Sequence, residues 1–346
     1  MAPPVRLARR RLIEGPPPAG VSAFEGVGVV LLDSDPLAPL DGSLGEASTA
    51  TAIAGLGGAF YLDPELIAVA ALGGQDPAAV AGRVAPVFCG AGNDALPIAV
   101  VRGHDLLDEL EELMRGGAPL AHAETGDPYT RLTAPTVAAS ARLGADAVAA
   151  AIGNGGRLVV VGHASVESLV AGSAGVAFDS PAVGEAVKAF SCGCGPVEVE
   201  PSTATPQQPT SSTPVDIVYR DGFAATAVIA TQGPQAVSET ALDHLRAELT
   251  SDGLAEADVH LEGYAPAGEG LQAIVLACVT APQADRAEQA LMRLRAITAA
   301  SAGGARLHDL CPAQAFPRYK VWPTSVPSDL VGWSVEVRET RGWTEA

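Results

Sequence analysis

Basic residues are scarce in this chain of 346 residues. Lys and Arg together number 21, against 40 Asp and Glu, which gives a formal net charge of -19 at neutral pH. An excess of negative charge of this size repels nucleic-acid phosphates and anionic lipid headgroups. We therefore expect neither a nucleic acid nor a membrane surface as a partner.

Long apolar runs are also missing. No apolar segment reaches the roughly 18 to 20 residues that a membrane-spanning helix requires. The arginines near the start, among them Arg6 and Arg9, lead into a proline-rich stretch and not into the apolar core of a secretory signal. Five cysteines, an odd number spread along the chain, are typical of reduced thiols. These absences together predict a cytoplasmic protein.

Glycine motifs that bind phosphates are absent as well. The loop after the first apolar run lacks the G-x-G-x-x-G spacing, and G-x-x-x-x-G-K occurs nowhere, so nicotinamide and ATP enzymes of standard type are not expected. The His, Glu and Asp residues of 118–131 match no known metal-ligand spacing. Cys192-Gly-Cys194 is a weak signal without further ligands nearby. We therefore expect no cofactor and no metal.

The first half of the chain alternates apolar runs with Ala-rich segments. Continuous apolar runs bounded by glycines are typical of parallel strands, because helices cover both faces of such a sheet. We predict strands at 26–33, 86–89, 96–101 and 158–161, and helices at 46–56, 63–72, 106–114, 135–152 and 183–190. The pattern predicts a disordered leader over 1–20 and an α/β domain with a mostly parallel sheet over 21–190.

A second pattern follows a segment rich in Pro, Ser and Thr, which predicts a linker at 191–214. Beyond it we predict strands at 215–219, 223–231, 259–264 and 272–280, and helices at 233–249 and 282–300. Arg220-Asp221-Gly222 suggests a hairpin turn between the first two strands. Helices alternating with antiparallel strands predict an α+β domain of ferredoxin-like type over 215–335, with a tail at 336–346.

The loop Gly162-His163-Ala164-Ser165 is the strongest candidate for a site. It follows the apolar run 158–161, and ligands of parallel sheets usually bind beyond the carboxyl ends of the strands. His163 could act there as a general acid or base. The alternative, that its imidazole caps the next helix or fills space, stays open.

A second candidate is the loop Gly90-Ala91-Gly92-Asn93, which follows the predicted strand 86–89. Backbone amides of such a loop can face a ligand, although these glycines could equally serve only to turn the chain. We interpret His104 and Asp105 as the start of a helix, because Asp stabilises a helix start whatever the chemistry.

Four segments of the chain resemble the acyclic terpene utilisation family AtuA. They are IAVVRGHDLLDELEEL, VAASARLGADAVAAAIGNGGRLVVVGHASVESLV, VYRDGFAATAVIATQGPQAVSETALDHLRAEL and YKVWPTSVPSDLV, in this order. The resemblance implies an α/β domain followed by a ferredoxin-fold domain, and a role in the catabolism of branched terpenoid acids as CoA thioesters. The chain differs from the family pattern where Ser140 replaces Asn, His163 replaces Arg and Val166 replaces Asp.

Our first hypothesis is an enzyme of lyase or hydratase type that acts on a short or branched acyl substrate, either a CoA thioester or a carboxylic acid. Its acid or base would be His163, with Glu46 and Asp33 as partners. The residues expected to bind the substrate are Gly90, Gly92, Asn93, Ser140, Gly162 and Ser165. The alternative is a non-catalytic subunit that pairs with a homologous subunit, so we expect a homo-oligomer or a hetero-oligomer.

Overall fold

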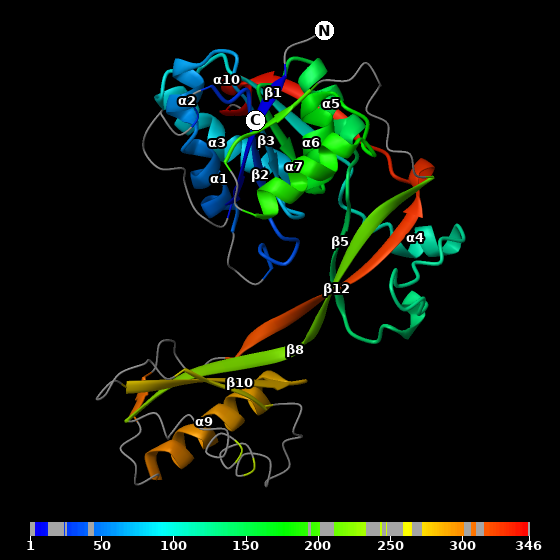
Figure 1. Cartoon of the computed structure of the whole chain (residues 1–346). Coiled ribbons are helices and arrows are strands. Elements are labelled where there is room, and N and C mark those ends of the chain that lie inside the picture. Colours follow the sequence, from blue (N-terminus) through cyan, green and yellow to red (C-terminus); the bar gives the residue numbers. More distant parts are fainter. Residues whose placement is uncertain are drawn as a thin grey trace. The chain divides into compact units, whose positions relative to one another are not determined.

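The computed structural model describes residues 4–12, 24, 26–40, 45–192, 195–200, 211–232, 243, 247, 259–264, 272–300, 306–308 and 315–344 (Figure 1). The chain divides into two compact units. The first consists of Met1–Tyr219 and Val321–Ala346, and the second of Arg220–Lys320. Within the described ranges, no helix is both long and apolar enough to cross a membrane.

A seven-stranded sheet forms the centre of the first unit. Its strands are β1 (Val5–Arg11), β2 (Val29–Asp33), β3 (Ile67–Ala71), β4 (Pro97–Arg102), β6 (Leu158–Val161), β7 (Val197–Val199) and β13 (Ser334–Glu339). Their order is β13-β4-β6-β3-β2-β1-β7. The inner five strands are parallel, and the edge strands β7 and β13 are antiparallel to their neighbours. The predicted α/β unit with a mostly parallel sheet is therefore confirmed.

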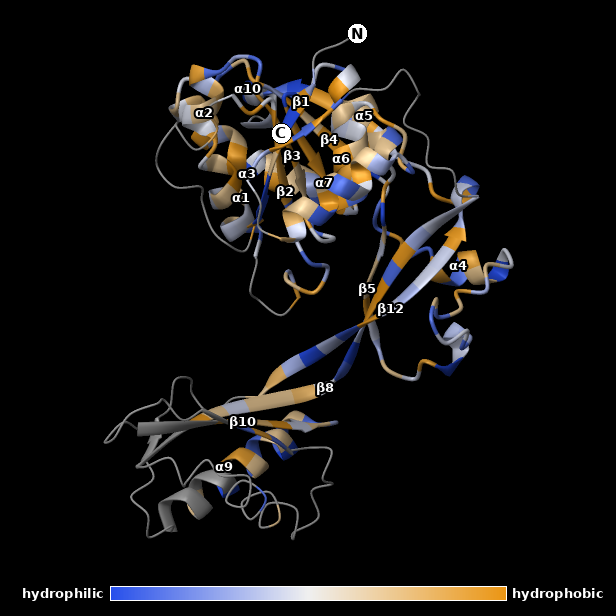
Figure 2. Cartoon of the chain, viewed as in Figure 1, coloured by the Kyte–Doolittle hydropathy of each residue, from blue (hydrophilic) through white to orange (hydrophobic). Residues whose placement is uncertain are grey.

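Helices cover both faces of this sheet. They are α1 (Glu46–Ala54), α2 (Gly57–Leu62), α3 (Pro77–Gly90), α5 (Ala145–Gly153), α6 (Val166–Ala174), α7 (Pro181–Ser191) and α10 (Thr340–Thr344). One apolar cluster joins the sheet to α1, α2, α3 and α10, and a second joins it to α5, α6 and α7 (Figures 1 and 2). Neighbouring residues of β2, such as Val30 and Leu31, enter different clusters because side chains alternate along a strand. Burial on both faces explains the continuous apolar runs.

A second group of strands belongs partly to each unit. β5 (Thr136–Ala141) pairs antiparallel with the first residues of β8 (Ser212–Gln232), within the first unit. This unit also contains α4 (Leu110–Arg115) and the last residues of β12 (Phe316–Pro327). The pairing of β5 with β8 brings residue 216, far along the chain, beside residue 140.

The second unit contains an antiparallel sheet in the order β11-β8-β10-β9. Its elements are β9 (Val259–Tyr264), β10 (Gln272–Ala281), β11 (Arg306–His308) and the helix α9 (Ala284–Ala300). β9, β10 and α9 confirm the strands and the helix predicted there. The helix predicted at 233–249 lies outside the described residues, apart from 243 and 247. The ferredoxin-like arrangement therefore stays a prediction.

The domain boundaries differ from the prediction at both ends of the first unit. Val5–Arg11 forms β1 and not a disordered leader, because Arg9 pairs with Asp33 of β2 and Leu7 is buried. Residues 13–20 lie outside the described ranges. The predicted tail is wrong as well, since β13 pairs with β4 and α10 packs on α3. Within the predicted linker, Val197–Val199 forms β7 and 212–214 belong to β8.

Three predicted elements of the first unit have the wrong type. The segment 63–72 contains the buried strand β3, and 86–89 belongs to α3, in which Pro86 is accommodated. The single helix predicted over 135–152 is the strand β5 followed by α5. Periodicity alone does not distinguish a buried strand from a buried helix in apolar segments such as these.

The predicted hairpin at Arg220-Asp221-Gly222 is also wrong. β8 continues through these residues as one strand of 21 residues. Gly222 adopts a φ of 89°, and a Cβ at this position would lie 2.6 Å from the carbonyl oxygen of Ala281. The glycine therefore permits a close approach between neighbouring strands and does not reverse the chain.

Candidate functional site

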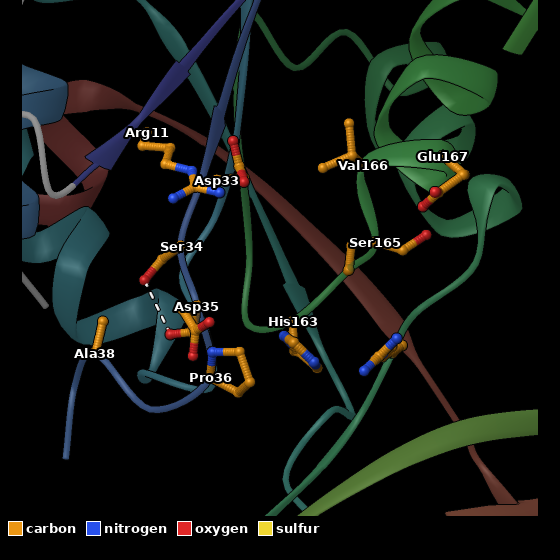
Figure 3. A pocket seen from close by; sticks show the side chains of 12 residues that line it. Arg11, Asp33, Ser34, Asp35, Pro36, Ala38, His163, Ser165, Val166 and Glu167 are labelled. Atoms are coloured by element: carbon orange, nitrogen blue, oxygen red, sulfur yellow. Dashed lines mark hydrogen bonds between the residues drawn. The ribbon is translucent and has the colours of Figure 1, made fainter. Parts of the chain in front are cut away.

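A pocket of about 340 Å³ lies at the carboxyl ends of β1, β2 and β6 (Figure 3). Its position agrees with the expectation that ligands bind beyond the ends of parallel strands. The residues that line it are Arg11, Asp33, Ser34, Asp35, Pro36, Ala38, Arg142, His163, Ala164, Ser165, Val166 and Glu167.

His163 lies in the loop between β6 and α6, as predicted, and only 4% of it is exposed. Its Nε2 is 2.8 Å from Oδ2 of Asp216. Its Nδ1 is buried and has no hydrogen-bond partner among the described residues. Its carbonyl oxygen accepts a hydrogen bond from the backbone N–H of Leu143, at 2.9 Å. The imidazole is thus held from one side, and its second nitrogen is buried without a partner among the described residues.

Asp216 is the acceptor that holds this imidazole. It lies on β8 opposite Ser140 of β5, and 1% of it is exposed. Arg142 donates two hydrogen bonds to its carboxylate, at 2.7 and 2.8 Å. Burial alone would raise the pKa of Asp216, but the hydrogen bonds from His163 and Arg142 outweigh burial and lower it. The carboxylate is therefore ionised at neutral pH.

An ionised Asp216 determines the tautomer of a neutral His163. A carboxylate can only accept, so Nε2 must carry the proton and donate it to Oδ2. The lone pair of the imidazole then resides on Nδ1, the nitrogen without a partner. A neutral imidazole that is oriented by a carboxylate in this way can accept a proton from a bound molecule. His163 and Asp216 together form a dyad suited to general acid–base chemistry.

Asp33 lines the pocket, but its carboxylate pairs with Arg9 and not with His163. Arg9, on the neighbouring strand β1, donates two hydrogen bonds of 2.8 Å to the Asp33 carboxylate. Arg11 lies two residues after Arg9, so both side chains share one face of the sheet. Arg11 also stands in register with Asp33, and no ion pair involves its guanidinium within the described residues. This face therefore carries two guanidinium groups and one carboxylate.

Ser165 begins α6 at the rim of the pocket. Its side chain accepts a hydrogen bond of 3.2 Å from the backbone N–H of Ser168 and thereby caps the helix. The remaining N–H groups of the first helical turn have no partner within the helix, and Val166 and Glu167 of this turn line the pocket. A helix start in this position favours negative charge on a bound molecule.

The structure brings together only part of the predicted site. His163, Ser165 and Asp33 line the pocket. Ser140 and Gly162 are buried next to the dyad residues, in register with Asp216 and adjacent to His163. Glu46 forms an exposed ion pair with Arg83 and does not line the pocket.

The loop of Gly90, Gly92 and Asn93 lies at the end of the parallel strands opposite to the pocket. It precedes β4 and follows α3, so it stands at the amino end of the parallel strands. The Asn93 side chain donates a hydrogen bond to the carbonyl oxygen of Gly57 at 2.9 Å, which is a structural role. We expected this loop to bind the substrate because we predicted a strand at 86–89. These residues belong to α3, so the reason for that expectation no longer holds.

His104 packs against the loop that carries His163. Its ring packs directly against the backbone of Gly162, so a Cβ there would overlap the imidazole. Burial lowers the pKa of His104, in spite of the nearby carboxylate of Asp105, so the ring is neutral at neutral pH. The Asp105 side chain accepts a hydrogen bond from the N–H of Leu107, but it caps a turn and not the predicted helix 106–114, because α4 begins only at Leu110. His104 therefore helps to position His163.

Replacing Gly162 by Ala should destabilise the first unit by about 1–3 kcal/mol, the usual cost of overpacking a core. The new methyl group must displace the His104 ring or the His163 backbone. Urea denaturation measures the loss. The substitution His104→Ala makes room, so the same change at Gly162 should cost less in that background. Gly153→Ala is the matched control, since a Cβ there meets no atom within 4 Å. Equal costs in both backgrounds would contradict the proposed contact.

Asp216 and Arg142 were missed in the sequence. Asp216 lies in the apolar stretch VDIVY. A single acidic residue in a strand that is otherwise apolar was the signal that could have identified it, because buried charges are rare unless they are paired. Arg142 follows the strand β5, which we expected to be helical. The pairing of β5 with β8 brings these residues together across more than 70 positions of sequence. Local patterns carry no information about that pairing.

Metal ligands do not gather in the described part of the chain. No group of three or more His, Cys, Asp or Glu side chains there could hold a metal ion. Cys89, Cys192 and Cys278 are free thiols, and burial raises the pKa of Cys278. The described side chains of the pocket can therefore donate, accept and move protons, without a candidate metal site among them.

Comparison with known proteins places most of the chain in a family. The sequence pattern of the acyclic terpene utilisation family protein AtuA matches residues 63–180 and 187–337, most of the chain. No curated protein and no solved structure matches. The matched ranges include Arg142, His163 and Asp216, whereas Arg11 and Asp33 precede them.

Proposed function

Because the chain belongs to the acyclic terpene utilisation family AtuA, we propose that it is an enzyme of acyl metabolism in which His163 acts as general acid and base. The observation that carries the proposal is the dyad: Nε2 of His163 is 2.8 Å from the Asp216 carboxylate, while its buried Nδ1 has no partner among the described residues. A buried imidazole held in one tautomer beside a pocket is the arrangement that proton transfer needs.

We assign the reaction to the lyase or hydratase class. In the direction of dehydration, Nδ1 of His163 accepts the proton from the carbon next to the acyl carbonyl. The electron pair of that C–H bond forms the new double bond to the next carbon. The hydroxyl group on that next carbon then accepts this proton from His163 and departs as water. One base that becomes the acid is sufficient for this reaction.

The negative charge that develops on the acyl oxygen needs stabilisation. The first-turn N–H groups of α6, at Val166 and Glu167, are the donors that we assign to this role, because both residues line the pocket. Donors at a helix start are fixed in direction before the substrate arrives, which is the condition for effective stabilisation. The volume of about 340 Å³ lies at the lower end of the range for small-molecule sites, which favours a short acyl group.

Exchange of hydrogen for deuterium tests the proposal before the substrate is known. The purified protein is incubated in D₂O with short and branched acyl-CoA thioesters and with the corresponding acids. We expect deuterium at the carbon next to the carbonyl of at least one compound, since the deuteron on Nδ1 returns to that carbon. Mass spectrometry and NMR detect it. No exchange in any compound, from a folded sample, would contradict the enzyme and favour the non-catalytic subunit that pairs with a homologue.

A further inference from the structure

We propose that Arg11 binds a carboxylate of the substrate, remote from the carbon at which His163 acts. The proposal deepens the function proposed above and rests on it. The substrate class is an acyl compound that carries a free carboxylate at its far end. Arg11, Arg142 and His163 line the same pocket, as do three acidic residues, so the charges of this pocket have to be accounted for one by one.

Two of the arginines near the pocket form bidentate pairs with carboxylates. Arg142 donates two hydrogen bonds to Asp216, and Arg9 donates two to Asp33. Such bidentate pairs leave little positive charge for a ligand. Arg11 shares the sheet face of Arg9, stands opposite Asp33 in register, and is exposed. Within the described residues its guanidinium has no ion pair, so one positive charge is in excess on this face.

The other two acidic residues of the pocket lining, Asp35 and Glu167, have structural roles. Asp35 accepts a hydrogen bond of 2.8 Å from the N–H of Leu37, which closes the turn after β2. Glu167 lies in the first turn of α6, where a negative charge stabilises the helix. In Figure 3, Arg11 lies apart from both Glu167 and His163 in the view. An anion that contacts Arg11 therefore need not approach the Glu167 carboxylate.

The order of the strands separates Arg11 from the dyad. Arg11 ends β1 and His163 follows β6, with β2 and β3 between them. Three spacings between neighbouring strands amount to about 14 Å. The Arg11 side chain can reach back over only part of this span. A single carboxylate cannot contact Arg11 and also be the acyl group that reacts at His163, so the carboxylate and the reacting acyl group lie at opposite ends of one molecule.

A pair of uncharged and charged probes tests this inference. The probes are the monoamides of straight-chain dicarboxylic acids of four to eight carbons, and the matching diamides, titrated calorimetrically. The amide end mimics the acyl carbonyl, and the two probes of a pair differ only in the remote carboxylate. We expect the wild-type protein to bind at least one monoamide about 10-fold more tightly than its diamide, the usual gain of a charge-assisted contact.

Variants assign this preference to Arg11. Arg11→Gln should bind both probes equally, whereas Arg83→Gln, whose ion pair with Glu46 lies outside the pocket lining, should keep the preference. The inference is overturned if no monoamide binds, if the wild type binds both probes equally, or if the preference survives in Arg11→Gln. His163→Gln separates the two proposals: the preference for the monoamide should persist there while deuterium exchange is lost. Binding that depends on Arg11, without exchange in the wild type, would contradict the reaction alone.

Discussion

The substitution Asp216→Asn should lower turnover by about 10³- to 10⁴-fold, the size of effect expected when an orienting carboxylate is replaced by an amide. The amide of Asn can donate to Nε2 of His163, and this donation would move the imidazole proton to Nδ1. The lone pair that we assign to the base would then be lost. The geometry of the pocket would change little, because Asn and Asp have nearly the same shape.

The same substitution should also reduce stability, by about 3 kcal/mol, since it removes the charged partner of a buried pair. We take the lower end of the usual range because the side chain of Arg142 is 40% exposed and keeps part of its hydration. The pKa of Asp216 is lowered in the folded protein, so its contribution is present above the unfolded value near 3.8 and is lost as the pH falls through the folded value. The difference between variant and wild type should therefore shrink in acid.

Turnover of the compound identified by deuterium exchange and urea denaturation at two pH values measure both effects. Asp221→Asn is the matched control, because Asp221 forms a partly exposed ion pair with Arg318 in the second unit. This control should keep wild-type turnover. Wild-type turnover in Asp216→Asn would exclude the dyad as the source of the base.

His163→Gln should lower turnover by about 10²- to 10⁴-fold, the usual contribution of a positioned general base. Glutamine has no titratable group, but its amide can still donate a hydrogen bond to Asp216. We therefore expect a smaller loss of stability than for Asp216→Asn, and an unchanged preference for the probe that carries a carboxylate. Steady-state kinetics and denaturation separate the two effects.

The matched control for this change is His260→Gln, an exposed histidine of β9. If both variants turned over substrate at the wild-type rate, His163 would be a structural histidine, which is the alternative that its sequence context left open. A loss of stability in His163→Gln as large as that in Asp216→Asn would also count against a catalytic role, because misfolding would then explain the loss of turnover.

The sequence was informative where a pattern was local. The apolar run Leu158–Val161 predicted β6 and the loop that follows it, and thereby the position of His163. This signal involves neighbours in the chain, where strand burial follows from the residue types themselves. The alternation of apolar runs with Ala-rich segments likewise predicted the α/β architecture.

The prediction failed where tertiary contacts decide the structure. β1 contains four arginines and resembles a solvated segment, yet Arg9 pairs with Asp33 and Leu7 enters the core. Asp216 acquires its role only because β8 pairs with β5. Glu46 and the loop at Gly90 have residue types that suit a site, but the fold places them elsewhere. Residue type indicates what a side chain can do, and the fold decides whether it meets a partner.

The strand β13 has a consequence for how the protein is made. It pairs with β4 through contacts such as Ser334 with Arg102, across more than 200 residues of sequence. While the chain is being synthesised, β4 has no neighbour on that side, so its edge offers open N–H and C=O groups to any other strand. Contacts this distant also slow folding, because a long loop must close first. The nascent chain is therefore most prone to aggregate before residue 339 has emerged, and a chaperone that covers β4 during this interval should raise the yield of folded protein.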